Sequence, residues 1–118
     1  MDDLIFSYSR KQALADGVLI DVTELAKEVG IKVPVAITAT LYNSFIRTEI
    51  PSQDTTGRLW DTLVLLVISA KNCNENTLFF GVSFQMTEIE YETPMLKAVI
   101  GPGDDGSPVI TIMLEDED

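Results

Sequence analysis

The sequence predicts an α+β fold in which N-terminal helices pack on one face of a C-terminal antiparallel sheet, a meander of three or more strands. Apolar residues recur at helical spacing in the first part of the chain, and the spacing changes to alternation from Thr77. Two further apolar segments, 95–100 and 109–114, flank a loop of Gly, Pro and Asp, which favours an antiparallel hairpin. We therefore expect one domain over residues 1–118, with a short, frayed acidic tail at 115–118.

The first helix is expected over residues 10–15, because Ser9 can cap it and Gly17 can end it. A serine hydroxyl accepts a hydrogen bond from an unpaired amide of the first helical turn. Glycine tolerates the positive φ that commonly follows a helix. The largely apolar segment 18–22 then predicts a short strand.

Two more helices are predicted next. Thr23 is a good N-cap residue for a helix over 24–29, and Gly30 follows as the residue with positive φ. Pro34 suits the first turn of a third helix over 34–47, since proline loses no helical hydrogen bond there. Apolar side chains recur in it at helical spacing, although several are β-branched and disfavour a helix.

Residues 57–71 predict a fourth helix, which is placed centrally because its side chains are apolar on nearly every side. The run 63–68 fits a buried strand equally well, since periodicity does not separate the two over so few residues. The Ala-Lys-Asn sequence at 70–72 favours the end of a helix. Alternation over 77–86 predicts a half-buried strand, and a turn or bulge near Thr87 must keep the following glutamates out of the core.

The negative charge is concentrated in the last third of the chain. Residues 76–118 carry nine carboxylates and one cation, Lys97, which gives a formal charge of −8 out of the total of −11. The negative electrostatic field of this region repels nucleic acids and membrane headgroups and attracts basic protein surfaces. The predicted partner is therefore a protein, with no direct binding to nucleic acid or membrane.

Residue content disfavours several kinds of chemistry. The chain has no histidine and a single cysteine, Cys73, so it can form no Ser-His or Cys-His catalytic system, no His-bound zinc and no internal disulfide. The loop 101–108 lacks the spacing of a calcium hand and the lysine of a phosphate loop. No cofactor, metal site or catalytic residue is predicted.

A cytoplasmic location is expected. The longest apolar run, 63–68, is too short to span a membrane. The first residues also lack the basic charge that begins a signal peptide.

Five acids are the candidate binding residues. If residues 88–92 were extended, alternate glutamates would project on one side about 6.6 Å apart, much as phosphates follow a nucleic acid. The alternative is a solvated strand edge whose like charges prevent aggregation. Trp60 and Tyr91 are possible anchors, although a lone tryptophan before an apolar run is more often a core residue. The five acids are Glu88, Glu90, Glu92, Asp104 and Asp105.

Several segments resemble a known family, and the most specific is Gly-Pro-Gly-Asp-Asp-Gly-Ser-Pro-Val-Ile-Thr-Ile-Met-Leu. The segments are 8–13, 16–22, 26–30, 34–38, 57–61 and 101–114. On these residues the chain resembles small uncharacterised proteins encoded on bacterial plasmids, phages and other mobile elements. The resemblance implies a setting in mobile DNA and binding to host or element proteins, and it implies no catalytic residue.

These observations favour a non-enzymatic acidic accessory protein of a mobile genetic element, which binds a host or element protein and in one version imitates nucleic acid. A first alternative is a small-ligand-binding protein or a carboxylate-based enzyme with a pocket beside Trp60 and Tyr91. A second alternative is a self-associating structural subunit, for example a homodimer in which an exposed strand pairs across a two-fold axis.

Overall fold

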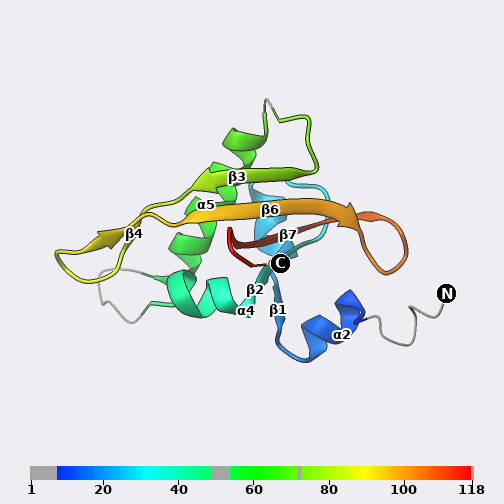
Figure 1. Cartoon of the computed structure of the whole chain (residues 1–118), viewed down its shortest axis with the longest axis horizontal. Helices are drawn as coiled ribbons and strands as arrows, with labels where there is room; N and C mark the ends of the chain where they lie inside the picture. Colours follow the sequence, from blue (N-terminus) through cyan, green and yellow to red (C-terminus); the bar gives the residue numbers. More distant parts are fainter. Residues whose placement is uncertain (1–7, 49–53, 72, 118) are drawn as a thin grey trace.

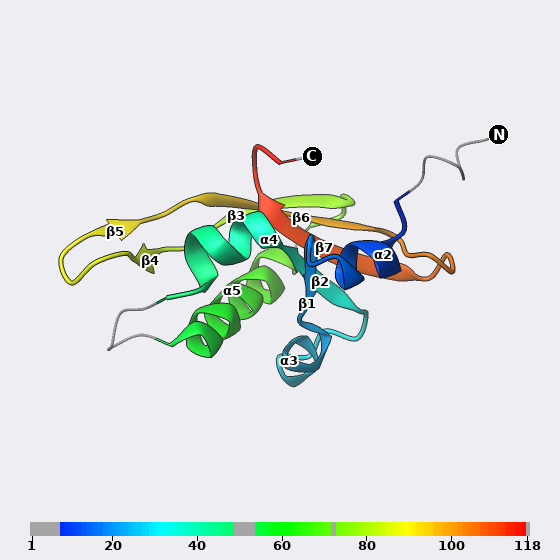
Figure 2. The same ribbon diagram turned by 90° about the horizontal axis from the view of Figure 1, so that it is seen from below.

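The computed structural model describes residues 8–48, 54–71 and 73–117. Its main sheet has five strands in the order β1-β2-β7-β6-β3, and a second, two-stranded sheet pairs β4 with β5. Helices α3 and α5 lie on one side of the main sheet (Figure 1, Figure 2). The strands are β1 Leu19–Asp21, β2 Val35–Thr38, β3 Thr77–Gly81, β4 Phe84–Gln85, β5 Tyr91–Glu92, β6 Met95–Pro102 and β7 Pro108–Leu114. The helical segments are α2 Arg10–Ala15, α3 Thr23–Glu28, α4 Ala39–Leu41, the π-helix η1 Tyr42–Ile46, and α5 Thr55–Ala70.

The α+β class is confirmed, but the main sheet is mixed and does not belong to the C-terminal half alone. Strand β2 pairs in parallel with β7, with Val35 opposite Ile110, whereas the other neighbouring strands are antiparallel. The expectation of a purely antiparallel C-terminal meander was therefore wrong. The sheet is mixed because β1 and β2, from the first part of the chain, add to the edge of the β6–β7 hairpin.

The third helix predicted over 34–47 was wrong in its first part. Val35–Thr38 is strand β2, and Val35, Ala36 and Ile37 are all at most 1% exposed. A strand buried on both faces shows no alternation, so its short apolar run does not separate it from a buried helix. Helix begins only after Thr38, whose hydroxyl accepts a hydrogen bond from the Leu41 amide at 3.2 Å.

The first helix and its cap are confirmed. The Gln12 amide donates to Ser9 Oγ at 3.0 Å, and Gly17 has a φ of +78°. The second helix is also present, but the expected cap was wrong. Thr23 Oγ1 accepts from the Val35 amide at 3.1 Å and so ties the start of α3 to β2, while the Thr23 amide donates to Asp21 Oδ1 at 3.0 Å.

The apolar run 63–68 lies within α5, which confirms the helical interpretation. Leu63 and Leu66 point into the core, at 0% and 4% exposure. Their core neighbours come from β2, β3, β6 and β7, so α5 closes one side of the main sheet. The helix begins after Asp54, whose Oδ1 accepts a hydrogen bond from the Gly57 amide.

The alternating segment after Thr77 is confirmed as extended chain with one buried face. Phe80, Val82 and Phe84 are at most 5% exposed, but the strand is interrupted at 82–83, between β3 and β4. The required turn lies where it was expected, because the amides of Met86 and Thr87 both donate to the Glu90 carbonyl, at 2.8 and 3.2 Å.

The C-terminal tail is held against the sheet and is not frayed over its described residues. Glu117 Oε2 accepts hydrogen bonds from Thr38 Oγ1 and from the Leu114 amide, each at 2.8 Å. Lys97 Nζ donates to the Glu117 carbonyl. The last carboxylates therefore do not all belong to a free acidic tail, and Asp118 lies outside the described residues.

The central place of β2 predicts a large effect of a substitution there. Ile37→Ala is expected to lower the free energy of unfolding by about 3 kcal/mol, because it leaves a cavity at a fully buried site. Urea denaturation measures the change. The control Val18→Ala, at a side chain 50% exposed, is expected to change it by less than about 0.5 kcal/mol. Equal effects would contradict a buried central strand.

Candidate protein-interaction surface

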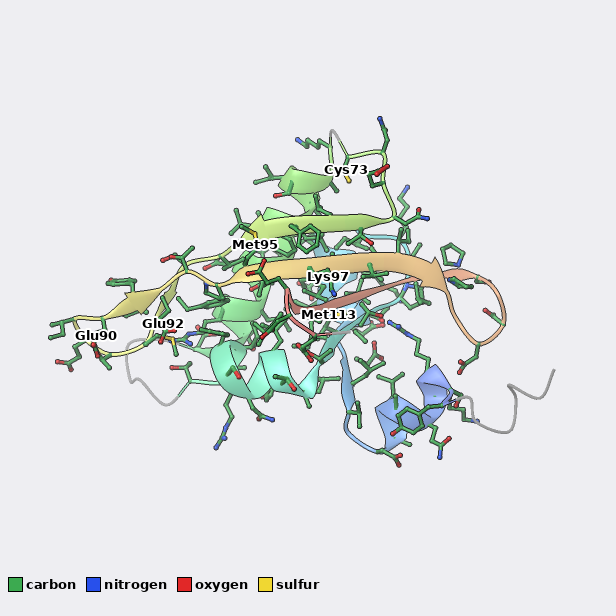
Figure 3. The ribbon with its side chains drawn as sticks, viewed as in Figure 1. Cys73, Glu90, Glu92, Met95, Lys97 and Met113 are labelled. Carbon is green, nitrogen blue, oxygen red and sulfur yellow. The ribbon has the colours of Figure 1, made fainter. Side chains whose placement is uncertain are left out.

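The five candidate acids lie at opposite ends of an elongated molecule. Its principal extents are 52 × 32 × 26 Å. Glu88, Glu90 and Glu92 lie on the projecting β4–β5 hairpin, residues 84–92, which we call the arm, and Glu90 and Glu92 are labelled there (Figure 3). Asp104 and Asp105 lie in the turn between β6 and β7, at the other end (Figure 1). The five therefore do not form one continuous acidic surface.

The two aspartates in the β6–β7 turn make hydrogen bonds within the fold. Asp104 accepts from the Arg10 and Lys11 amides, each at 2.9 Å, and so holds the start of α2 against the turn. These two hydrogen bonds lower the pKa of Asp104 below its ordinary value, and the bond from the Lys11 amide has the largest effect. Asp105 Oδ1 accepts from the Ser107 amide at 2.9 Å. These contacts give both aspartates a structural role.

Arg10 completes the attachment of α2. Its Nη1 donates to Thr111 Oγ1 at 2.7 Å and its Nη2 to the Ile110 carbonyl at 2.9 Å. Partial burial lowers the pKa of Arg10, and the charges of Asp21 and Asp104 oppose that shift. The basic residue at the start of α2 is thus used to join the helix to β7.

The arm is exposed and is built on a tight turn. Thr87 Oγ1 accepts from the Glu90 amide at 3.0 Å and from the Ile89 amide at 3.3 Å. The backbone therefore bends at 87–89, so the extended row of three glutamates does not form. All three glutamates are exposed, and no described lysine or arginine forms an ion pair with them. Between them, the apolar Ile89 is 88% exposed and Tyr91 is 64% exposed.

A buried arginine fixes the base of the arm. Arg58 of α5 is 6% exposed, and it donates from Nη1 to the Phe45 carbonyl at 2.6 Å and from Nη2 to the Gln85 carbonyl. Its guanidinium carbon lies 5.8 Å from the centre of the Phe84 ring, which stacks on Phe45 at 5.4 Å. Burial lowers the pKa of Arg58 from its ordinary value. One side chain thus joins η1, α5 and β4.

The sequence drew attention to Trp60 as a possible anchor, and the clamp formed by the nearby Arg58 was missed. The carbonyl partners lie 13 and 27 residues away in the chain. A local motif gives no sign of such partners. The one available signal was an arginine at the start of a strongly apolar helix. If such a helix is buried, the arginine needs hydrogen-bond acceptors in the interior.

The two possible anchors lie on different elements. Trp60 is 38% exposed on α5, so the interpretation of Trp60 as a core residue was wrong. Helical spacing places it on the same outer side as Ile68, which is 55% exposed. Tyr91 lies on the arm. The two anchors therefore come from different elements, α5 and β5.

Among the pockets that described residues line, three lie elsewhere, and Trp60 and Tyr91 line none of these three. A groove of 660 Å³ runs between α2 and the β6–β7 hairpin, and an apolar pocket of 190 Å³ lies near Cys73. A third pocket, of 490 Å³, is lined in part by Arg10, Asp21, Glu24, Asp104 and Asp105. Most of its acids already accept backbone hydrogen bonds.

Two other kinds of feature are absent from the described ranges. No group of three or more Cys, Asp or Glu side chains is placed to hold a metal ion there. In the same part of the chain, no helix is both long enough and apolar enough to cross a membrane.

Comparison with known proteins identifies a family. A family model described as a family of unknown function, DUF6573, matches residues 1–118. No curated protein and no solved structure matches the chain.

The clamp predicts that Arg58→Leu lowers the free energy of unfolding by about 2 to 4 kcal/mol, because two buried carbonyl oxygens lose their donors. Urea denaturation measures the loss, and the amide NMR signals of the arm are expected to broaden. Lys32→Leu, at an exposed cation, serves as the control and is expected to cost less than about 0.5 kcal/mol. If the two variants are equally stable, the clamp is not structural.

The contact between Asp104 and α2 predicts a dependence on pH. The folded pKa lies below the ordinary 3.8, so the stabilisation is fully present above that pH and is lost as the pH falls through the folded value. The protection factors of the Arg10 and Lys11 amides, taken relative to the intrinsic exchange rate at each pH, are expected to fall at acidic pH, and in Asp104→Ala already at pH 7. Asp105→Ala is the control, and it should leave both amides protected. Slow exchange in Asp104→Ala would contradict the attachment.

Proposed function

We propose that this chain, which belongs to the family of unknown function DUF6573, is a non-enzymatic protein-binding module. In this proposal its arm contacts a basic surface of a partner protein. The contact residues are Glu88, Glu90 and Glu92 for charge, with Ile89 and Tyr91 between them as apolar anchors.

The observation that carries the proposal is the exposed arm on a fixed base. Ile89 is 88% exposed, so its side chain contributes little to the core. Exposed apolar and aromatic residues beside unpaired charges are typical of protein-binding surfaces. The clamp at Arg58 holds the base of the arm in place, which reduces the entropy lost when a partner binds.

The partner class is proposed to be a nucleic-acid-binding protein. Carboxylates on a projecting hairpin present negative charge to a basic groove that otherwise receives phosphates. The resemblance to proteins of plasmids, phages and other mobile elements supports a cytoplasmic host or element protein as the target. Asp104 and Asp105 contribute to the negative field from the opposite end of the molecule, without direct contact in this proposal.

A second candidate function is the binding of a small cationic ligand. The pocket lined by Asp21, Glu24, Asp104 and Asp105 favours it. Calorimetric titration with spermidine tests it, since heat that disappears in Glu24→Gln would support this function. Because three of the four acids already accept backbone amides, we rank it below the arm.

The proposed contact predicts that neutralising the arm abolishes partner capture. The test is an affinity capture from lysate of the native host, with the protein as bait. The variant with Glu88→Gln, Glu90→Gln and Glu92→Gln is expected to lose the proteins that the wild type retains. Their capture by the wild type should fall as salt rises from 50 to about 500 mM, and competing duplex DNA should release them.

The matched control carries Glu28→Gln, Asp61→Asn and Asp116→Asn, three exposed acids away from the arm. It has the same net charge as the arm variant, so a loss of capture in both would indicate a general field effect. Capture that persists in the arm variant and at high salt would contradict the proposed function.

A further inference from the structure

Strand β3 has an open edge. It pairs with β6 on one side, and no described strand pairs with its other side. At the two ends of the ladder, the Ile100 amide donates to the Asn76 carbonyl at 2.9 Å and the Val82 amide to the Pro94 carbonyl at 3.3 Å. In an antiparallel pair, alternate residues direct their N–H and C=O groups to opposite sides. Thr77, Phe79 and Gly81 therefore direct these groups away from β6.

Other elements contact two further edges, those of β4 and β1. Strand β4 follows β3 along the same edge, and there the Gln85 carbonyl already accepts a hydrogen bond from Arg58. At the far edge of the main sheet, β1 is in contact with α2. Strand β3 offers an unpaired edge over a length of about 17 Å for five residues.

Strand β3 also lacks the features that protect an edge. Its sequence, Thr-Leu-Phe-Phe-Gly, contains no charge and no proline, which natural sheets commonly place at exposed edges. Phe79 is 53% exposed, and Lys97 and Met113 follow it in register across the sheet. Lys97 and Met113 are labelled on this face in Figure 3. An incoming strand would therefore find free backbone groups beside an exposed aromatic ring.

The charge around this edge selects the kind of strand. Glu75 lies two residues before β3 and is exposed, and the arm with its three glutamates follows the other end. A second copy of the chain, paired antiparallel along β3, would bring Glu75 of one copy toward the arm of the other. A segment with basic residues at its ends would meet opposite charge at both places.

We propose that β3 accepts an extended, basic segment of the partner protein as a sixth strand of the main sheet. The segment places an apolar side chain beside Phe79 and a lysine or arginine toward each acidic end. Main-chain hydrogen bonds to Thr77, Phe79 and Gly81 supply affinity, and the side chains supply selectivity. The proposal rests on the proposed function, since the arm supplies half of the charge that selects the segment.

A displayed library of ten-residue peptides, selected against the wild-type protein, tests the proposal. The enriched peptides are expected to alternate apolar and polar residues and to carry Lys or Arg near both ends. Phe79→Pro is expected to weaken their binding about tenfold or more, because proline removes the outward N–H and leaves the β3–β6 ladder intact. The control Phe79→Val keeps the N–H and should stay within about threefold of the wild type.

Hydrogen exchange on the peptide complex gives a readout at single residues. The Thr77, Phe79 and Gly81 amides should gain protection on binding, whereas Leu78 and Phe80 are already bonded to β6 and should change little. Equal affinity of Phe79→Pro and wild type, or enriched peptides without basic residues, would overturn the proposal. Sedimentation of the protein without peptide gives a further check. A dimer that forms in the wild type and is lost in Phe79→Pro would also overturn the proposal, because β3 would then pair with a second copy of the chain.

The arm variant separates the two proposals. If Glu88→Gln, Glu90→Gln and Glu92→Gln leave peptide affinity unchanged while Phe79→Pro abolishes it, β3 pairing is supported, whereas the basic residue proposed at the arm end and the function proposed for the arm both fail. If the arm variant weakens binding and the amides of β3 stay unprotected, the arm binds the peptide and β3 pairing fails.

Discussion

The placement of the candidate surface depends on one buried cation. Arg58 enters the interior from α5, and two main-chain carbonyls and an aromatic face surround its guanidinium. Burying a charge without a carboxylate partner is expensive, and strong hydrogen bonds to fixed carbonyl dipoles offset that cost only while all three elements stay together. The end of η1, the start of α5 and the base of the arm are therefore stabilised as a unit. The same contact occupies the Gln85 carbonyl at the edge of β4.

The acidic residues divide into two groups with different tasks. Asp104, Asp105 and Glu117 accept hydrogen bonds that attach α2, shape the β6–β7 turn and hold the C-terminal segment. The glutamates of the arm have few internal partners, and they stand beside exposed apolar side chains. Net charge alone does not separate these groups, because a carboxylate bonded within the fold and a free one count equally. The function assigned to the acidic region therefore rests on the arm, where charge and exposure coincide.

The two edges of the mixed main sheet are formed by different parts of the chain, β1 and β3. The parallel contact between β2 and β7 brings the N-terminal strands onto the hairpin, so β1 becomes one edge and contacts α2. The opposite edge strand, β3, pairs with no further strand within the described residues. An edge strand that is both uncharged and unpaired risks aggregation, and natural proteins commonly protect such strands. An acidic flank at each end is consistent with a strand reserved for a basic partner.

The sequence by itself determined the elements whose signals are local. Ser9 and Gly17 delimit α2, the apolar run within α5 is helical, and glycine and proline residues mark the β6–β7 turn. Each of these depends on neighbours within a few residues, which a sequence displays directly. Only the tertiary structure decided that 35–38 is a central strand, since burial on both faces removes the alternation that identifies strands. It also decided the roles of Arg58 and Asp104, because their partners lie 13 to 94 residues away and hydrogen bonds between such distant residues leave no periodic pattern.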